Sequence, residues 1–223
     1  MCGRFASFGS EPEVVGAFDV DEVLGYLGPS WNVAPTQSVS LVAETVVDGA
    51  VVRQLRTARW GLVASWAKSV AGPPLVNARA ETLTVKASFR AAARRRRAIV
   101  PANGYYEWLD KTPYYLAPAD GGLLGFAGVY EWWHAPDDSW LCSVAVVTRP
   151  ASDALGHVHD RMPVVVPPDL RDAWLDPALT GAADVDALLA AIPVPELVPR
   201  QVGPAVGSVR NNGPELIAEL TRW

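Results

Sequence analysis

The sequence has very little cysteine, with two residues in 223, and only three histidines. Two cysteines are too few for a disulfide framework or for a four-thiolate zinc site. A reducing, cytosolic environment is therefore expected. The spacing of His157 and His159 is compatible with metal binding, but no convincing third and fourth ligands follow nearby in the sequence. We expect no metal and no other cofactor.

Long hydrophobic runs are also missing. The longest, such as Val144 to Val147, fall far short of the roughly 18 apolar residues that a membrane-spanning helix needs. The first 20 residues include Glu11, Glu13 and Asp19 and lack the basic-then-apolar profile of a signal peptide. The sequence thus predicts a soluble cytosolic protein, without a membrane partner and with a monomer as the simplest state.

The net charge of −5 argues against a nucleic-acid partner, but charge distribution matters more than its sum. Residues 79–97 carry seven arginines or lysines and a single acid, Glu81. Such a segment can steer a polyanion to one face of an acidic protein. Nine tryptophans lie along the chain, and exposed aromatic rings beside a basic groove hold single strands. Each tryptophan is also compatible with a place in the core.

Strand patterns outnumber helix patterns, and short Gly/Pro loops join most of them. β-Branched runs on both sides of Asp48-Gly49 predict a hairpin over 38–60. Helices are expected at 11–27, at 89–97 with Ser88 as the cap, at 168–175 and at 184–191. Further strands are expected at 97–101, 105–109, 113–117, 123–130, 140–148 and 163–167. These patterns predict one α+β domain over residues 2–223, with a partly closed antiparallel sheet and peripheral helices.

Cys2 directly follows the initiator methionine. Its small side chain permits removal of Met1, which leaves a free α-amine beside the thiol. The unperturbed pKa values are about 8.5 for the thiol and about 7.7–8.0 for the amine, so both groups are partly nucleophilic at neutral pH. An aldehyde reacts with such a pair to form an imine and then a five-membered thiazolidine. A chance cysteine at position 2 is the plainer interpretation.

Two further polar residues lie in strand-like segments. Asn77 alternates with Arg79 and Glu81, so an extended segment points all three to one face. Its amide can hold a substrate hydroxyl or an amine, or it can belong to an Asx turn after Pro73-Pro74. Glu107 stands among aromatic residues in GYYEWLD. Burial would raise its pKa toward the range of a general acid or base, whereas a water-facing strand glutamate would have no such role.

His159 lies in GHVHDRMP, beside Asp160. An imidazole can move protons near pH 7, and the neighbouring carboxylate can orient it. A Ser-His-Asp triad is possible on composition, but the sequence contains no G-x-S-x-G nucleophile elbow.

Ordered motifs span nearly the whole chain. They are MCGRF at 1–5, WNVAPTQ at 31–37, RWGLVASWAK at 59–68, NARAET at 77–82, SFR at 88–90, IVPANGYYEW at 99–108, FAGVYEWW at 126–133, VVT at 146–148, HDRMPVVV at 159–166 and VRNNGPEL at 209–216. Together they resemble the SOS response-associated peptidase (SRAP) family, which processes abasic sites in single-stranded DNA. Ala64, Ala98 and Asn103 depart from common family residues, and residues 170–205 match only loosely.

The resemblance implies roles for four catalytic residues. Cys2 would form a stable thiazolidine with the ring-opened aldehyde of an abasic site. Asn77 would position the terminal amine and the sugar. Glu107 would transfer protons and take part in reversal of the crosslink, and His159 would assist ring opening. Trapping the aldehyde prevents strand cleavage by β-elimination, and weak lyase activity would accompany an imine intermediate.

The resemblance also implies a compact α+β fold with a positive cleft for single-stranded DNA. The residues expected to contact DNA are Arg4, Trp66, Arg79, Arg90, Thr148 and Arg161.

Two other functions compete with abasic-site crosslinking. One is a thiol peptidase that cleaves the Met1–Cys2 bond or other peptides with Cys2, Glu107 and His159. The other is a non-catalytic single-strand binding module. Binding by such a module would survive Cys2→Ala, since it needs no thiol at position 2.

Overall fold

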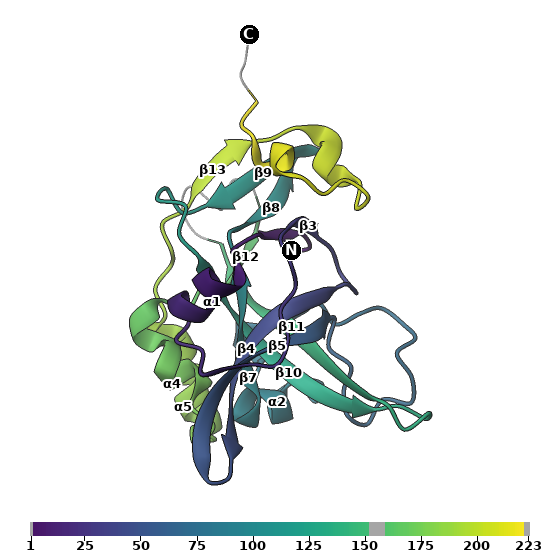
Figure 1. Ribbon diagram of the computed structural model, residues 1–223, viewed down its shortest axis with the longest axis vertical. Helices are drawn as coiled ribbons and strands as arrows, with labels where there is room; N and C mark the ends of the chain where they lie inside the picture. The colour runs from purple at the N-terminus through teal and green to yellow at the C-terminus, as the bar shows by residue number, and fades with distance from the viewer. Residues whose placement is uncertain (1, 152–158, 221–223) are drawn as a thin grey trace.

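The computed structural model describes residues 2–151 and 159–220 (Figure 1). Its centre is a closed ring of five strands. Neighbours pair antiparallel in the order β5-β4-β7-β10-β11, and a parallel pairing between β11 and β5 completes the ring. The strands are β4 (Ser38–Val47), β5 (Ala50–Trp60), β7 (Arg97–Ala102), β10 (Leu124–His134) and β11 (Trp140–Pro150). The predicted barrel-like, mainly antiparallel core is confirmed.

Three short strands attach to this ring at β5 and β11. β2 (Glu22–Val23) pairs parallel with β5, and β6 (Asn77–Arg79) pairs parallel with β11. β12 (Arg161–Pro163) pairs antiparallel with β11. β6 and β12 therefore meet on the same strand, and Thr148 of β11 has register partners in both.

A second antiparallel sheet lies at one end of the barrel, above it in Figure 1. Its strands, in spatial order, are β13 (Val198–Gln201), β9 (Thr112–Ala117), β8 (Gly104–Leu109), β1 (Phe5–Ser7) and β3 (Ser30–Val33). Because β1 lies between β8 and β3, the start of the described chain is held on both sides by backbone hydrogen bonds.

The helices are short and peripheral, in keeping with the predicted α+β class. They are α1 (Glu11–Ala17), α2 (Arg90–Arg95), α4 (Arg171–Leu175) and α5 (Ala182–Ala191), with 3₁₀ turns η1 (Ala80–Thr82), η2 (Pro168–Leu170), η3 (Pro204–Gly207) and η4 (Pro214–Ile217). No helix in the described ranges is both long and apolar enough to cross a membrane.

Strand alternation divides the barrel side chains into two cores. The inner core contains residues such as Leu41, Val100, Phe126 and Val144. Their strand neighbours face outward and pack under the helices, among them Val42, Ile99, Ala127 and Ala145. A third cluster lies within the second sheet and its 3₁₀ turns, around Tyr106, Tyr115, Val206 and Leu216. Both faces of β8 are therefore buried.

The hairpin over 38–60 is confirmed, including its turn. Asp48 has φ 50° and Gly49 has φ 83°, and two such residues in sequence make the turn that matches the twist of a hairpin. The strands at 97–101, 105–109, 113–117, 123–130 and 140–148 are also present, with the bounds given above.

Three local expectations are wrong in part. The helix expected over 11–27 ends at Ala17, because Asp21 and Leu24 bond to the edge of β5 instead. Ser88 does not cap α2. The backbone already forms a turn before the helix, in which the Lys86 carbonyl accepts from the N–H groups of Phe89 and Arg90, and Phe89 occupies the cap position. The strand expected at 163–167 is assigned to Arg161–Pro163, followed by a single bridge at Val165.

The last two expected helices differ only at their ends. Residues 168–175 form η2 and then α4, and the helix expected at 184–191 begins two residues earlier, at Ala182.

Candidate active site

Cys2 lies at the inner core of the barrel and has no exposed surface. β1 anchors it there, because the ring of Phe5 packs edge-on against Trp60 at 5.0 Å and against Phe126 at 5.8 Å. A chain terminus is usually poorly ordered unless packing ties it down. Here the packing of Phe5 fixes the segment, so position 2 has a defined place inside the barrel.

Asn77 contacts Cys2 directly. Its Nδ2 donates a hydrogen bond of 2.8 Å to the Cys2 carbonyl oxygen. β6 carries Asn77 along β11, in register with Val146 of the inner core. The buried Asn77 Oδ1 has no hydrogen-bond partner among the described residues, so the amide keeps one acceptor for another group. This contact favours a positioning role over the Asx-turn alternative.

Glu107 is buried, with 4% of its surface exposed, so the water-facing alternative is wrong. It follows Tyr105 and Tyr106 on β8, and Tyr106 donates its backbone N–H to the Arg4 carbonyl at 2.9 Å. Alternation places Glu107 on the same face as Tyr105, which belongs to the inner core with Cys2. Burial is the main cause that raises the pKa of Glu107 to about 7.

The Cys2 thiol is held in its neutral form. Burial, and secondarily the negative charge of Glu107, raise the pKa of the thiol far above its ordinary value. The two groups are thus close enough to interact electrostatically. Since a thiolate is not the resting state, the thiol needs a base when it reacts.

His159 follows the undescribed residues 152–158, which include His157. Its Nδ1 lies 2.9 Å from the backbone nitrogen of Arg161, which donates to it, and 2.8 Å from Asp160 Oδ1. Burial lowers the pKa of the imidazole, which favours the neutral ring at pH 7. Nδ1 thus contacts both an N–H donor and a carboxylate oxygen, and these two contacts favour opposite tautomers of the ring.

This loop lies near Glu107. The negative charge of Asp160 is among the influences that raise the pKa of Glu107, after burial. The structure therefore brings together Cys2, Asn77, Glu107 and the His159 segment, which come from four separate parts of the chain. Tyr105 shares this environment, since burial raises the pKa of its hydroxyl and the charges of Cys2 and Glu107 raise it further.

Tyr105 and Glu81 were not predicted as site residues. Tyr105 could have been found because it lies two residues before Glu107 on one strand, so both side chains point to the same face. Glu81 had a weaker signal, its alternation with Asn77 and Arg79. Its position in η1 places it in an ion pair with Arg161, with Nη1 to Oε1 at 2.6 Å.

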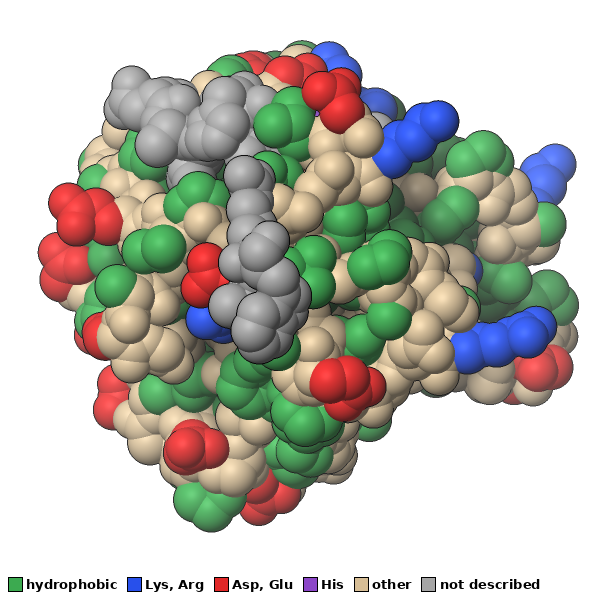
Figure 2. Space-filling model, turned by 90° about the horizontal axis from the view of Figure 1, so that it is seen from above, with side chains coloured by type: hydrophobic (Ala, Val, Ile, Leu, Met, Phe, Trp, Pro, Cys, Tyr) green, Lys and Arg blue, Asp and Glu red, His purple; other side chains and the backbone are tan. Residues whose placement is uncertain are grey.

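The six predicted DNA contacts divide into two groups. Arg79, Arg90 and Trp66 are exposed, and Trp66 has 69% of its surface accessible. Three others are engaged within the protein: Arg4 donates to Asn32 Oδ1 and to the Val206 carbonyl, both at 2.7 Å, Thr148 is buried, and Arg161 binds Glu81. Figure 2 shows most basic side chains of one face on one side of it, while acidic side chains are scattered over the whole face.

The basic run of residues 94–97 is not one solvated face. Arg97 is buried and donates hydrogen bonds to four backbone carbonyls, those of Trp174, Ala93, Leu179 and Asp176. Arg96 pairs with Glu131 at 2.7 Å. Only Arg94 and Arg95 remain exposed in this run. The expected steering field is therefore smaller than the sequence indicates.

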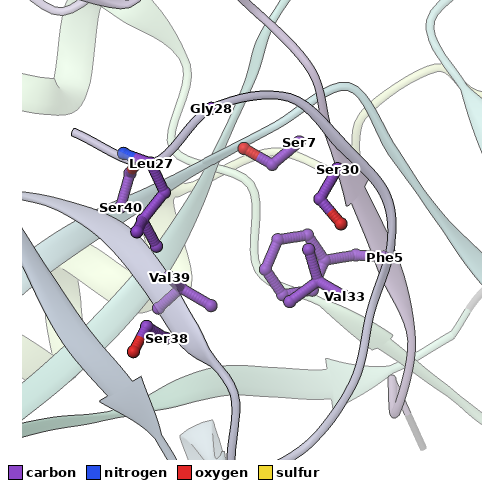
Figure 3. Close-up of a pocket in the computed structure, with 9 residues that line it drawn as sticks. All are labelled: Phe5, Ser7, Leu27, Gly28, Ser30, Val33, Ser38, Val39 and Ser40. Carbon is purple, nitrogen blue, oxygen red and sulfur yellow. Dashed lines mark hydrogen bonds between the residues drawn. The ribbon is translucent and has the colours of Figure 1, made fainter. Parts of the chain in front are cut away.

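A cavity of about 30 Å³ lies beside Phe5 (Figure 3). Four serine hydroxyls line it together with apolar groups, and it holds about two water molecules at most. Its lining residues are Phe5, Ser7, Leu27, Gly28, Ser30, Val33, Ser38, Val39 and Ser40. The cavity is too small for a nucleotide. Within the described ranges no three His, Cys, Asp or Glu side chains are grouped to hold a metal ion.

The fold and the site define an α+β barrel protein with a cysteine at position 2 that is buried beside an amide and a carboxyl group. A family profile described as SOS response associated peptidase (SRAP) matches residues 1–209. The chain belongs to this family.

Curated relatives match over almost the whole chain. Abasic site processing protein YoqW of Bacillus subtilis is 36% identical over 225 residues, covering 97% of this chain and 99% of the relative. Abasic site processing protein YedK of Escherichia coli is 31% identical over 228 residues, with the same two coverages. Mouse abasic site processing protein HMCES is 29% identical over 233 residues, covering 85% of this chain and 65% of the relative.

Solved structures agree on the fold. A crystal structure of a Bordetella bronchiseptica protein has a TM-score of 0.77 at 23% identity, covering 91% of this chain and all of the other. A phage-related protein of the same species has a TM-score of 0.70 at 29% identity, covering 90% of this chain and 94% of the other.

Proposed function

We propose that this protein binds single-stranded DNA and forms a covalent thiazolidine between Cys2 and the aldehyde of an abasic site. Curated relatives named abasic site processing proteins support this function, as does the site described above. In this proposal residues 2–223 act as one domain, as a monomer in the cytosol. The crosslink shields the lesion from strand cleavage.

The reaction begins with removal of Met1, which exposes the α-amine of Cys2. Abasic sugars are mostly closed hemiacetals, so the ring must open before attack. As the ring opens, the 1-hydroxyl gives up its proton, the bond from C1 to the ring oxygen breaks and the ring oxygen takes a proton; His159 can relay that proton from one oxygen to the other. The Asn77 Nδ2 bond to the Cys2 carbonyl holds the new terminus in place, and Asn77 Oδ1 can accept from its amine.

The amine then adds to the aldehyde carbon, and loss of water gives an imine. The thiol sulfur adds to the imine carbon, the C=N electron pair moves to nitrogen, and the thiol proton ends on nitrogen. Glu107 suits this transfer, because a carboxyl group with a pKa of about 7 can both take and return a proton near neutral pH. The net change is one aldehyde and one aminothiol converted to a thiazolidine and water.

DNA binding rests in this proposal on the exposed groups. Arg79 and Arg90 would meet phosphates, and Trp66 would stack on a base near the lesion. Arg4, Thr148 and Arg161 would serve first by shaping the site, because each is engaged within the protein.

The Asn77–Cys2 hydrogen bond, formed beside a buried carboxyl group, carries the proposal. This hydrogen bond goes to the main chain and fixes position 2 whatever its side chain, and the buried Cys2 thiol beside the carboxyl group of Glu107 adds the nucleophile. A thiol peptidase would use the same residues, and cleavage of the Met1–Cys2 bond is compatible with both functions. Turnover of foreign peptides would favour the peptidase.

The test mixes purified protein with a single-stranded oligonucleotide that carries one abasic site, followed by a denaturing gel. Cys2→Ala tests the nucleophile, and Cys142→Ala, which removes the other buried cysteine, is its matched control. We expect a heat-stable adduct with wild type and Cys142→Ala only, and none with undamaged DNA. Protein shown by mass to begin at Cys2 that forms no adduct would overturn the proposal. DNA binding that persists in Cys2→Ala without any wild-type adduct would indicate a binding module.

A further inference from the structure

A two-pronged ion pair lies beside the proposed catalytic group without belonging to it. Arg161 Nη1 donates to Glu81 Oε1 at 2.6 Å, and Nη2 donates to Oε2 at 2.9 Å. The arginine side chain is 11% exposed and the glutamate side chain 46%, so the carboxylate covers a largely buried guanidinium. Parallel double hydrogen bonds of this kind fix orientation as well as distance.

The pair joins the two chain segments that carry Asn77 and His159. Glu81 lies in η1, directly after β6, whose first residue is Asn77. Arg161 begins β12, two residues after His159. Both short strands pair with β11 only over three residues each, so few backbone contacts fix their spacing.

Arg161 also fixes the strand between them and the ring of His159. Its Nη2 donates to the Thr148 carbonyl at 2.6 Å and lies 3.3 Å from Thr148 Oγ1. Its backbone N–H donates to His159 Nδ1 at 2.9 Å. Any shift of Arg161 therefore moves a group that contacts the His159 ring.

We propose that Glu81 is a positioning residue, which holds Arg161 so that His159 and Asn77 keep their spacing across β11. Glu81 touches neither the thiol nor the proposed lesion, and it acts through Arg161. The proposal rests on the proposed function only for its activity measurement.

The competing role for Glu81 is that of a phosphate substitute, displaced when DNA binds. That role predicts tighter DNA binding when the carboxylate is removed, because the guanidinium would then be open to phosphate. The positioning role predicts a different result for the same substitution. DNA affinity is kept, and the rate at saturating DNA falls because the reacting groups lose their spacing.

The experiment compares wild type, Glu81→Gln and Asp186→Asn. The Asp186 carboxylate accepts from Thr84 Oγ1 at 2.9 Å and ties the same chain region to α5 instead of to Arg161, so it is a matched control. Two quantities are measured: the affinity for undamaged single-stranded oligonucleotide, and the single-turnover rate of adduct formation at saturating abasic oligonucleotide. A third readout is the imidazole ¹⁵N spectrum, in which subtraction of the His159→Gln spectrum identifies His159.

We expect Glu81→Gln to slow adduct formation by about tenfold or more while affinity changes by less than about twofold, with Asp186→Asn like wild type. The ¹⁵N signals of His159 should shift in Glu81→Gln, because the ring loses its fixed contact with the Arg161 N–H. Tighter binding with an unchanged rate, or no change in rate and spectrum, would overturn the positioning role of Glu81. If wild type forms no adduct, the proposed function fails and the ¹⁵N result alone decides. Should Glu81→Gln not fold, Arg161→Lys, which keeps the charge and loses the fork, must show the same loss.

Discussion

The side chain of Asn77 holds the backbone of Cys2 through a hydrogen bond of 2.8 Å, from a strand 75 residues away in the sequence. Its donor comes from β6, which runs along the barrel, and its acceptor from the segment that leads into β1. The contact therefore fixes the chain terminus relative to the barrel. The proposed chemistry depends on this, since both nucleophiles belong to residue 2.

Removal of the Asn77 amide should slow adduct formation strongly while lowering the stability of the fold only slightly. Asn77→Ala removes one hydrogen bond, so unfolding in urea should show a loss of about 1 kcal/mol. Adduct formation should slow by about tenfold or more, because the terminus is no longer held in place. A variant as fast as wild type, with the same modest loss of stability, would show that Asn77 does not position Cys2.

The rate of adduct formation should follow the ionisation of Glu107. Burial raises the pKa of this carboxyl group to about 7, so it is protonated below that pH and available as a base above it. We expect the single-turnover rate to rise as pH increases through about 7, and Glu107→Gln to be slow and to lose this limb. Rates measured from about pH 5.5 to 8.5 give the answer. An unchanged rising limb in Glu107→Gln would assign it to another group.

The ionisation of Glu107 should also affect the stability of the fold, which should fall as pH rises while the rate of adduct formation increases. Because the pKa of Glu107 is higher in the folded protein than in the unfolded chain, the folded state binds the extra proton between about pH 4.5 and 7. The contribution of Glu107 to stability is therefore largest at low pH and falls as pH rises through about 7. Thermal melts should show that Glu107→Gln gains more in Tm at about pH 8 than at about pH 5. An equal change at both pH values would contradict a perturbed carboxyl group.

Trp66 and Trp140 allow a matched test of base stacking. Their exposed fractions are 69% and 63%, so replacing either by alanine should leave the melting temperature nearly unchanged. Only Trp66 falls in the set predicted to contact DNA. Trp66→Ala should lose about 1–3 kcal/mol of affinity for single-stranded DNA in fluorescence titrations. Equal losses for both variants would point to a broader aromatic surface.

Arg97 and Arg95 differ by burial although they lie in one run of arginines. Arg97→Met leaves without a donor the four carbonyls that accept from its guanidinium. Urea unfolding should show that the free energy of unfolding falls by more than about 2 kcal/mol. Arg95→Met, on the exposed part of α2, should leave stability unchanged within about 0.5 kcal/mol. A small loss for Arg97→Met would mean that its carbonyl contacts contribute little to folding.

The barrel strands could be predicted because local patterns decide them. β-Branched runs, a two-residue turn at Asp48-Gly49 and short Gly/Pro connections are all properties of neighbouring residues. The end of α1 could not be predicted in the same way. Residues 18–24 leave the helix and pair with the edge of β5, and no local sequence pattern indicates this distant partner.

The burial of Glu107 illustrates the limit for the site. Alternation normally assigns one face of a strand to water, but β8 packs against the barrel on one face and against the third cluster on the other. Tyr105, Tyr106 and Glu107 are therefore all buried, and sequence alone could not choose among them. Arg161 shows the same limit, because its guanidinium meets Glu81 only after β6 and β12 have come together on β11.

In the proposed adduct both nucleophiles of Cys2 bond to the abasic carbon. Intact mass spectrometry of the adduct before and after borohydride treatment tests it most directly. A thiazolidine has a mass equal to the oligonucleotide plus the chain that begins at Cys2, less one water, and borohydride leaves this mass unchanged because no C=N bond remains. An adduct that gains two hydrogens with borohydride would be an imine alone, and an adduct that retains Met1 would exclude the α-amine of Cys2. Either result would contradict the thiazolidine.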